Sequence, residues 1–208
     1  MTRLFLNLLV ISILLLLPFS STAKERIMLI GDSLSAGYGL KQDQSWVNLL
    51  QNKYVEEKKP IEIINTAISG QTTDNALLKI DTWLQVHEPS HVLIELGGND
   101  GIRGFPIKLL KNHLTELVNK STQAGATVAL MEIQIPPNLG PRYTSMFTNS
   151  YHTVAKQTGA YFMPYFMTKV AVDKALMQND NLHPNAKAQP IIRDFMDIEI
   201  DKWLKSIK

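Results

Sequence analysis

The 208-residue chain contains no cysteine, which excludes disulfide bonds, thiolate chemistry and a lipid attached to an N-terminal cysteine. It also lacks a charge excess of either sign, with 21 Lys and Arg against 19 Asp and Glu. This balance gives no reason to expect a nucleic-acid partner. Beyond residue 23 no apolar run is long enough to cross a membrane, so we expect no membrane anchor in that part of the chain.

Two motifs of other hydrolytic proteins are missing as well. No group of His, Asp and Glu stands at the spacing of metal ligands, so we expect neither a metal ion nor a cofactor. A G-x-S-x-G sequence is absent too, which argues against the α/β-hydrolase fold and its nucleophile elbow.

The N-terminus has the pattern of a secretory signal peptide. Met1–Arg3 is short and basic, Leu4–Phe19 is almost entirely apolar, and Ser21-Thr-Ala23 supplies small residues before Lys24. We predict cleavage after Ala23, a mature chain of residues 24–208, and a periplasmic or secreted location. The alternative is an uncleaved anchor, which is disfavoured because the apolar run is shorter than the about 20 residues that span a bilayer.

Apolar strands and amphipathic helices alternate along residues 24–208. The strands are near-continuous apolar runs, as expected for a parallel sheet that is covered on both faces. We therefore predict one doubly wound α/β domain with a five-stranded parallel sheet. The expected strands are 27–30, 61–68, 91–96, 127–133 and 160–166, and the expected helices are about 44–57, 74–88, 107–123, 142–158 and 185–206. Pro190 lies inside the last helix, which either begins near it or kinks there.

Polar or glycine-rich segments follow four of these strands. In an open parallel sheet, ligands bind beyond the carboxyl ends of the strands, so these segments predict a site at that edge. The segments are Gly31-Asp-Ser33, Ser69–Thr73, Gly97–Gly101 and Asn179–Pro184.

Ser33, His183 and Asp180 have the chemistry of a nucleophile, a base and a group that orients the base. Among the five histidines only His183 stands in a polar loop at the expected edge, and Asp180 precedes it by three residues. The alternative is structural: a serine after Gly-Asp is a common helix cap, and an Asp-x-x-His pair on its own is more often a local fastener.

Hydrolysis through a serine also needs donors for an oxyanion. The candidates are the backbone N–H groups of Ser33 and Gly70 and the side-chain amide of Asn99. Gly70 has no side chain to block a close approach, but both it and Asn99 are also ordinary turn residues. We expect Asp32 and Asp100 to be helix caps and loop fasteners.

The segments Gly31-Asp-Ser-Leu34, Gly70, Gly98-Asn-Asp100 and Asp180-x-x-His183 resemble, in order and spacing, the four blocks of the GDSL, or SGNH, hydrolase family. The similarity runs over essentially all of residues 24–208. Within the family, the chain is most similar to the periplasmic thioesterase I, lysophospholipase and arylesterase group, through residues 31–38, 95–105 and 180–185.

This resemblance implies a flavodoxin-like three-layer α/β/α sandwich. It implies Ser33 as nucleophile, His183 as base and Asp180 as the residue that orients the base. It also implies an oxyanion hole made of Ser33, Gly70 and Asn99. The expected enzyme is a monomeric serine hydrolase that cleaves small-molecule acyl esters and thioesters, such as fatty-acyl esters, acyl-CoA and lysophospholipids.

Apolar residues near the expected site leave the substrate class open. They either line an acyl groove or anchor loops and helices to the core: Ile102, Phe105, Ile107, Ile135 and Leu139. One alternative function is a carbohydrate O-acetylesterase on the same scaffold. A second is a binding module without catalysis, which is disfavoured because all four sequence blocks are complete.

Overall fold

A five-stranded parallel sheet forms the centre of the molecule. The computed structural model describes residues 24–207, so the predicted signal peptide, residues 1–23, lies outside the described residues. The strand order is β2-β1-β3-β4-β5, and every neighbouring pair is parallel. The strands are β1 Glu25–Gly31, β2 Ile61–Asn65, β3 His91–Glu95, β4 Thr127–Met131 and β5 Tyr161–Met163. The predicted α/β fold with a five-stranded parallel sheet is confirmed.

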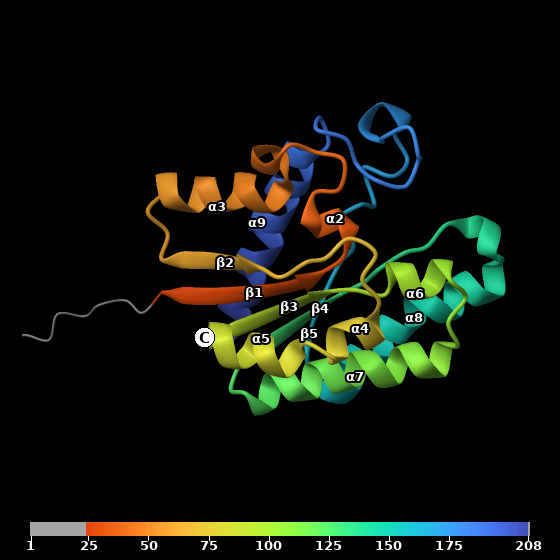
Figure 1. Ribbon diagram of the computed structural model, residues 1–208, viewed down its shortest axis with the longest axis horizontal. Coiled ribbons are helices and arrows are strands. Elements are labelled where there is room, and N and C mark those ends of the chain that lie inside the picture. The colour runs from red at the N-terminus through yellow and green to blue at the C-terminus, as the bar shows by residue number, and fades with distance from the viewer. Residues whose placement is uncertain (1–23, 208) are drawn as a thin grey trace, which may run out of the picture.

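Helices cover both faces of this sheet and complete three layers (Figure 1). The helices α3 and α9 lie on one face, and α4, α5, α7 and α8 lie on the other. The bounds are α2 Ser33–Ala36, α3 Trp46–Glu56, α4 Thr73–Leu77, α5 Ile80–His87, α6 Gly98–Ile102, α7 Ile107–Gln123, α8 Pro141–Thr158 and α9 Gln189–Ser206; short 3₁₀ turns are Gln42–Gln44, Pro137–Leu139 and Lys174–Leu176. Within residues 24–207, no helix is both long and apolar enough to span a membrane.

The order of strands reverses between β1 and β3, which are neighbours in the sheet. Such a reversal is the point where doubly wound sheets bind ligands, because the loops that leave the two strands run in opposite directions. Gly31, the last residue of β1, is paired with Glu95, the last residue of β3. The segments that carry Ser33 and Asn99 therefore leave the sheet side by side.

Strand β2 is shorter than the predicted 61–68. It ends at Asn65, whose side-chain oxygen accepts a hydrogen bond from the N–H of Ala67, 3.0 Å away. An Asn side chain that bonds to the backbone two residues on forms a turn and competes with the strand ladder. The fifth strand likewise covers only Tyr161–Met163 of the predicted 160–166.

The predicted helix 74–88 is divided into α4 and α5. The division is at Leu78 and Lys79, where the Lys79 N–H bonds to the carbonyl of Ala76, three residues back. This tighter turn ends α4, although the apolar spacing continues through it. The last helix, α9, begins at Gln189 with Pro190 in its first turn, where proline requires no kink.

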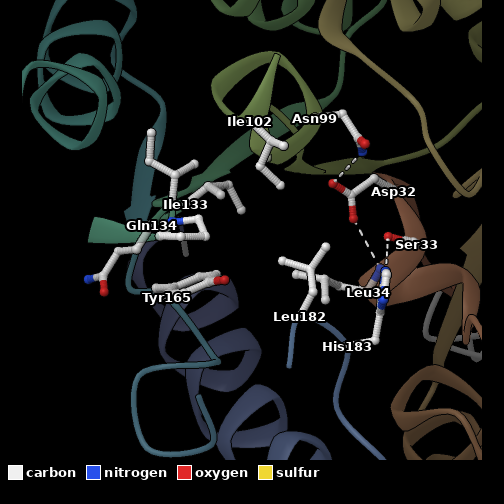
Figure 2. A pocket seen from close by; sticks show the side chains of 13 residues that line it. Asp32, Ser33, Leu34, Asn99, Ile102, Ile133, Gln134, Tyr165, Leu182 and His183 are labelled. Carbon is white, nitrogen blue, oxygen red and sulfur yellow. Dashed lines mark hydrogen bonds between the residues drawn. The ribbon is translucent and has the colours of Figure 1, made fainter. Parts of the chain in front are cut away.

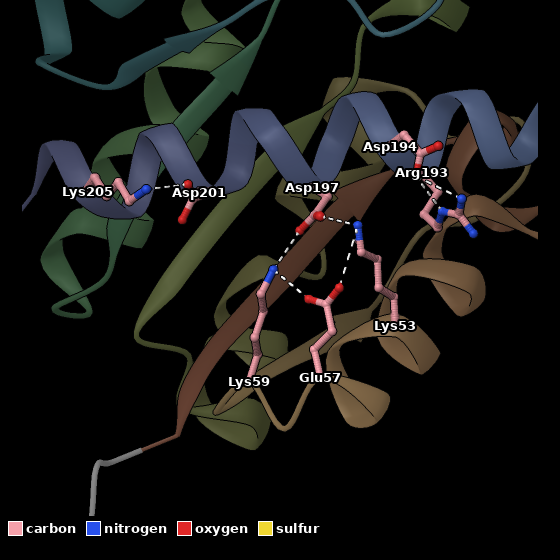
Figure 3. A network of polar contacts seen from close by, with 8 residues as sticks. All are labelled: Lys53, Glu57, Lys59, Arg193, Asp194, Asp197, Asp201 and Lys205. Carbon is pink, nitrogen blue, oxygen red and sulfur yellow. Dashed lines mark hydrogen bonds and ion pairs between the residues drawn. The ribbon is translucent and has the colours of Figure 1, made fainter.

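Helix α9 is fixed to α3 by an ion-pair network (Figure 3). Asp197 lies between Lys53 and Lys59, with N–O distances of 2.5 and 3.2 Å. Burial raises the pKa of Asp197, but the hydrogen bonds from both lysines outweigh this effect and lower it. Because α9 follows the segment that carries His183, this contact also restrains that segment.

The loop after β3 needs a glycine at position 97. Gly97 has a φ of +117°, and an added Cβ would lie 2.1 Å from the hydroxyl oxygen of Tyr151. That hydroxyl donates a 2.9 Å hydrogen bond to the carbonyl of Leu96 and so holds the loop in place. Backbone conformation and packing both exclude a side chain here.

We predict that Gly97→Ala lowers the free energy of unfolding by about 3 kcal/mol or more, because a left-handed strain and a steric clash add together. The matched control is Gly125→Ala, at φ +88° with nothing within 4 Å of the added Cβ. It should lose only about 1 kcal/mol. Denaturant unfolding measures both, and equal losses would contradict the packing argument.

Candidate active site

Ser33 occupies the first turn after β1, at the start of the short helix α2. Asp32 caps this helix, as expected, because its Oδ1 accepts the N–H of Leu34 at 3.0 Å. Gly31 must lack a side chain, since a Cβ there would lie 2.8 Å from Oε2 of Glu95. The turn therefore presents the Ser33 hydroxyl at the carboxyl edge of the sheet.

The structure brings Ser33, His183 and Asp180 into one hydrogen-bonded chain (Figure 2 shows the Ser33–His183 contact). Ser33 Oγ lies 2.8 Å from Nε2 of His183, and Nδ1 of His183 lies 2.7 Å from Oδ2 of Asp180. Burial raises the pKa of Asp180, but hydrogen bonds from His183 and from the Leu182 N–H outweigh it and lower the pKa to about 2. A carboxylate that stays ionised fixes which ring nitrogen carries the proton.

Tyr38 and Gln178 hold the His183 segment in place, and sequence reasoning did not single them out. The Tyr38 ring packs against the imidazole with 4.5 Å between ring centroids. Gln178 donates from Nε2 to the carbonyls of Tyr38 and Pro184, at 2.8 and 3.0 Å. These contacts connect the base to the loop that follows α2.

Two of the three predicted oxyanion donors are backbone N–H groups, those of Ser33 and Gly70. Among residues 24–207, the N–H groups of Ser33 and Gly70 donate to no protein acceptor. Gly70, at φ +78°, occupies the third position of a turn closed by the Gln71 N–H and the Ile68 carbonyl. Its own carbonyl accepts from Arg103 at 3.3 Å. Gly70 is not among the residues that line the cavity beside Ser33.

Asn99 lies at the start of α6, on the loop after β3. Its Nδ2 donates to Oδ2 of Asp32 at 3.2 Å and to the carbonyl of Gln71 at 3.1 Å. The next residue, Asp100, is fully buried and accepts the Thr73 N–H at 3.1 Å. Asp100 is thus a loop fastener, as expected.

A small cavity of about 50 Å³ opens beside Ser33 and His183. Of the five apolar residues predicted for an acyl groove, Ile102 and Ile135 line it. Phe105, Ile107 and Leu139 do not, and the last two pack against the core instead. The full lining is Asp32, Ser33, Leu34, Gly98, Asn99, Ile102, Ile133, Gln134, Ile135, Pro136, Tyr165, Leu182 and His183.

Two buried carboxyl groups stand behind the nucleophile. Glu95 is fully buried; its Oε2 accepts from Ser35 at 2.7 Å, while Oε1 has no partner among the described residues. Burial raises the pKa of Glu95 well above its usual value, and the neighbouring charge of Asp32 raises it further. Burial also raises the pKa of Asp32 to about 6, although hydrogen bonds from Leu34 and Asn99 oppose this. In the sequence, each of these two acids stands at or directly after the end of an apolar strand, and this pattern could have identified the pair.

Because its pKa is raised on folding, Asp32 makes the fold less stable as pH rises. Between the unfolded value of 3.8 and about 6, the folded chain keeps a proton that the unfolded chain releases. We predict that Asp32→Asn, which cannot titrate, does not show this loss. Its free energy of unfolding should therefore rise by about 2 kcal/mol relative to that of wild type between about pH 4 and pH 7.5. Urea unfolding at both pH values measures this, and parallel stability curves would contradict it.

The matches with known proteins extend over most of the chain. Residues 29–190 match the model of the GDSL-like lipase/acylhydrolase family. An arylesterase of Vibrio mimicus is 40% identical over 188 residues, which cover 90% of this chain and 94% of that protein. The thioesterase 1/protease 1/lysophospholipase L1 of Escherichia coli strain K12 is 38% identical over 183 residues, with coverages of 88% and 86%.

A solved structure agrees with the sequence comparison. The psychrotrophic esterase EstA from Pseudoalteromonas, inhibited by monoethylphosphonate, superimposes with a TM-score of 0.86 and 54% identity. The superposition covers 87% of this chain and 99% of EstA. Sequence motifs, fold and relatives thus lead to the same assignment: the chain belongs to the GDSL-like lipase/acylhydrolase family.

Proposed function

We propose that this protein hydrolyses carboxylic esters and thioesters through an acyl-enzyme on Ser33. The observation that carries the proposal is the hydrogen-bonded chain from Ser33 through His183 to Asp180, next to a cavity with apolar walls on one side. A hydroxyl is a weak nucleophile unless a base takes its proton, and this chain supplies that base in hydrogen-bond reach.

In the first step, Ser33 Oγ attacks the acyl carbonyl and its proton passes to Nε2 of His183. Asp180 holds the proton on Nδ1 and stabilises the imidazolium that forms. The carbonyl oxygen gains negative charge. The N–H groups of Ser33 and Gly70, which have no acceptor among residues 24–207, and the amide of Asn99 are proposed to stabilise it.

In the second step, the tetrahedral intermediate expels an alcohol, a phenol or a thiol, which takes the proton from His183. The acyl group stays on Ser33 as an ester. His183 then removes a proton from water, the resulting hydroxide attacks the acyl carbon, and the carboxylic acid leaves as Ser33 regains its proton.

The cavity favours an apolar acyl group. Its walls include Ile102, Ile133 and Ile135, and its volume of about 50 Å³ holds only a few non-hydrogen atoms. Longer acyl chains must therefore extend over Ile102 and Leu182, whose side chains are exposed at the cavity. Relatives named arylesterase and thioesterase/lysophospholipase support the same substrate classes for this chain.

We predict that Ser33→Ala reduces ester and thioester turnover by at least about 10⁴-fold, because the nucleophile is lost. The assay is a panel of p-nitrophenyl esters and acyl-CoA thioesters of increasing chain length, with acetylated sugars as a further arm. Far-UV circular dichroism and the melting temperature should match wild type. If Ser33→Ala turns over these substrates at the wild-type rate, the acyl-enzyme on Ser33 is refuted. If the wild-type enzyme turns over only the acetylated sugars, the O-acetylesterase alternative is selected.

We further propose that residues 24–208 are one domain that acts as a monomer in the periplasm or outside the cell. The support is the small-residue cleavage sequence that ends at Ala23 and the apolar run before it. Intact-mass measurement of the exported enzyme should give a chain that begins at Lys24, and light scattering should give the monomer mass. An exported chain that begins at Met1 would refute cleavage.

A further inference from the structure

The amide of Asn99 lies between two groups that accept hydrogen bonds. One is Oδ2 of Asp32, 3.2 Å from Nδ2, and the other is the carbonyl oxygen of Gln71, 3.1 Å from the same nitrogen. An ionised carboxylate and a peptide carbonyl accept hydrogen bonds and donate none. Only the nitrogen end of the amide can occupy this position without repulsion. Both hydrogens of Nδ2 have an acceptor here, so an oxyanion would share one of them in a three-centre hydrogen bond.

The two ends of an Asn side chain have nearly the same shape but opposite polarity. A donor facing a developing oxyanion stabilises it, whereas a carbonyl oxygen in the same place repels it. The proposed role of Asn99 therefore depends on which end of its amide lies beside Ser33. Figure 2 shows the Asn99 side chain directed at Asp32, next to the nucleophile.

We propose that Asp32 is a positioning residue, whose carboxylate, together with the carbonyl of Gln71, fixes the nitrogen end of the Asn99 amide at the cavity beside Ser33, where the reacting carbonyl would lie. The inference rests on the proposed function, since it assigns a task to a group of that same site. Asp32, the residue before the nucleophile, would thus determine the orientation of a hydrogen-bond donor, Asn99, on the neighbouring loop.

Asp32 is well held for this task. It is 4% exposed, its Oδ1 accepts the Leu34 N–H at 3.0 Å, and its own N–H points to Oε2 of Glu95 at 3.4 Å. A Cβ at position 98 would lie 3.2 Å from Oδ2, so Gly98 leaves the space that this oxygen needs. With both ends of the carboxyl group engaged, its orientation is determined.

A helix cap alone does not account for these contacts. Capping α2 uses only Oδ1 of Asp32, and serine performs the same function in many helices. The second oxygen, Oδ2, is directed at Asn99, which is 67 residues away in the chain. The two roles can therefore be separated by substitution.

Two substitutions disturb the contact in different ways. Asp32→Ser keeps an acceptor for the cap but is too short to reach Asn99. Asp32→Asn offers one acceptor instead of two, so it loses either the cap on Leu34 N or the contact with Asn99 Nδ2. The matched control is Ser35→Ala. It removes a buried hydroxyl from the same helix, and this hydroxyl contacts Glu95 and not Asn99.

The experiment is a double-mutant cycle with Asn99→Ala, in which kcat and KM for a p-nitrophenyl ester are measured at one pH near 8. Alone, Asn99→Ala should lower kcat about 10²–10³-fold. Asp32→Asn and Asp32→Ser should each lower it about 10-fold or more with KM unchanged, as expected for a lost charge-assisted hydrogen bond. Added to Asn99→Ala, they should lower kcat by no more than about 2-fold.

The proposal would be overturned if the Asp32 substitutions lowered kcat equally with Asn99 present and with Asn99→Ala. A wild-type kcat in both Asp32 variants would overturn it as well. Ser35→Ala should show no coupling to Asn99. If one Asp32 variant does not fold by circular dichroism, the other completes the cycle. Ser33→Ala separates the two proposals: if it stays active, the acyl-enzyme is refuted, whereas an inactive Ser33→Ala with an additive cycle refutes only the role of Asp32.

Discussion

The parallel pairing of β1 with β3 is the constraint on which the candidate site depends. The two strands are adjacent although they are not consecutive, and Gly31 is paired with Glu95 where both strands end. Slipping this register by one residue would turn every side chain of a strand to the opposite face of the sheet. Core packing therefore fixes where the Ser33 and Asn99 loops begin.

The same pairing places two carboxyl groups in the interior beside the nucleophile. Glu95 closes a strand that is otherwise apolar, and Asp32 follows β1 directly. Burying them costs free energy, as their raised pKa values show. Perturbed acids of this kind gather at functional sites, where local interactions favour chemistry over stability. The well-packed apolar strands around them supply the stability that the site lacks.

The base reaches the site by a different route from the nucleophile. His183 stands in an irregular segment between β5 and α9, outside the sheet ladder. Its position depends on the Tyr38 ring, on the three hydrogen bonds that Gln178 donates, and on the attachment of α9 to α3. The nucleophile is thus fixed by backbone pairing, whereas the base is fixed by side-chain contacts over a loop.

The sequence by itself determined the sheet, the strands near their observed places and the loops that carry polar chemistry, because apolar runs and turn residues act locally. It also led to Ser33, His183, Asp180 and Asn99 as candidates. It did not show the division of 74–88, since the apolar spacing continues through Leu78, nor that Phe105, Ile107 and Leu139 stay outside the cavity.

Only the tertiary structure decided which groups meet. The contact of Asp32 with Asn99, the burial of Glu95 and the support of His183 by Gln178 join residues from separate elements. Such contacts depend on the distance between strands and loops in space, which no local pattern of residues records. Asp32 therefore looked like a helix cap in the sequence, and its second oxygen acquired a partner only when β1 and β3 came together.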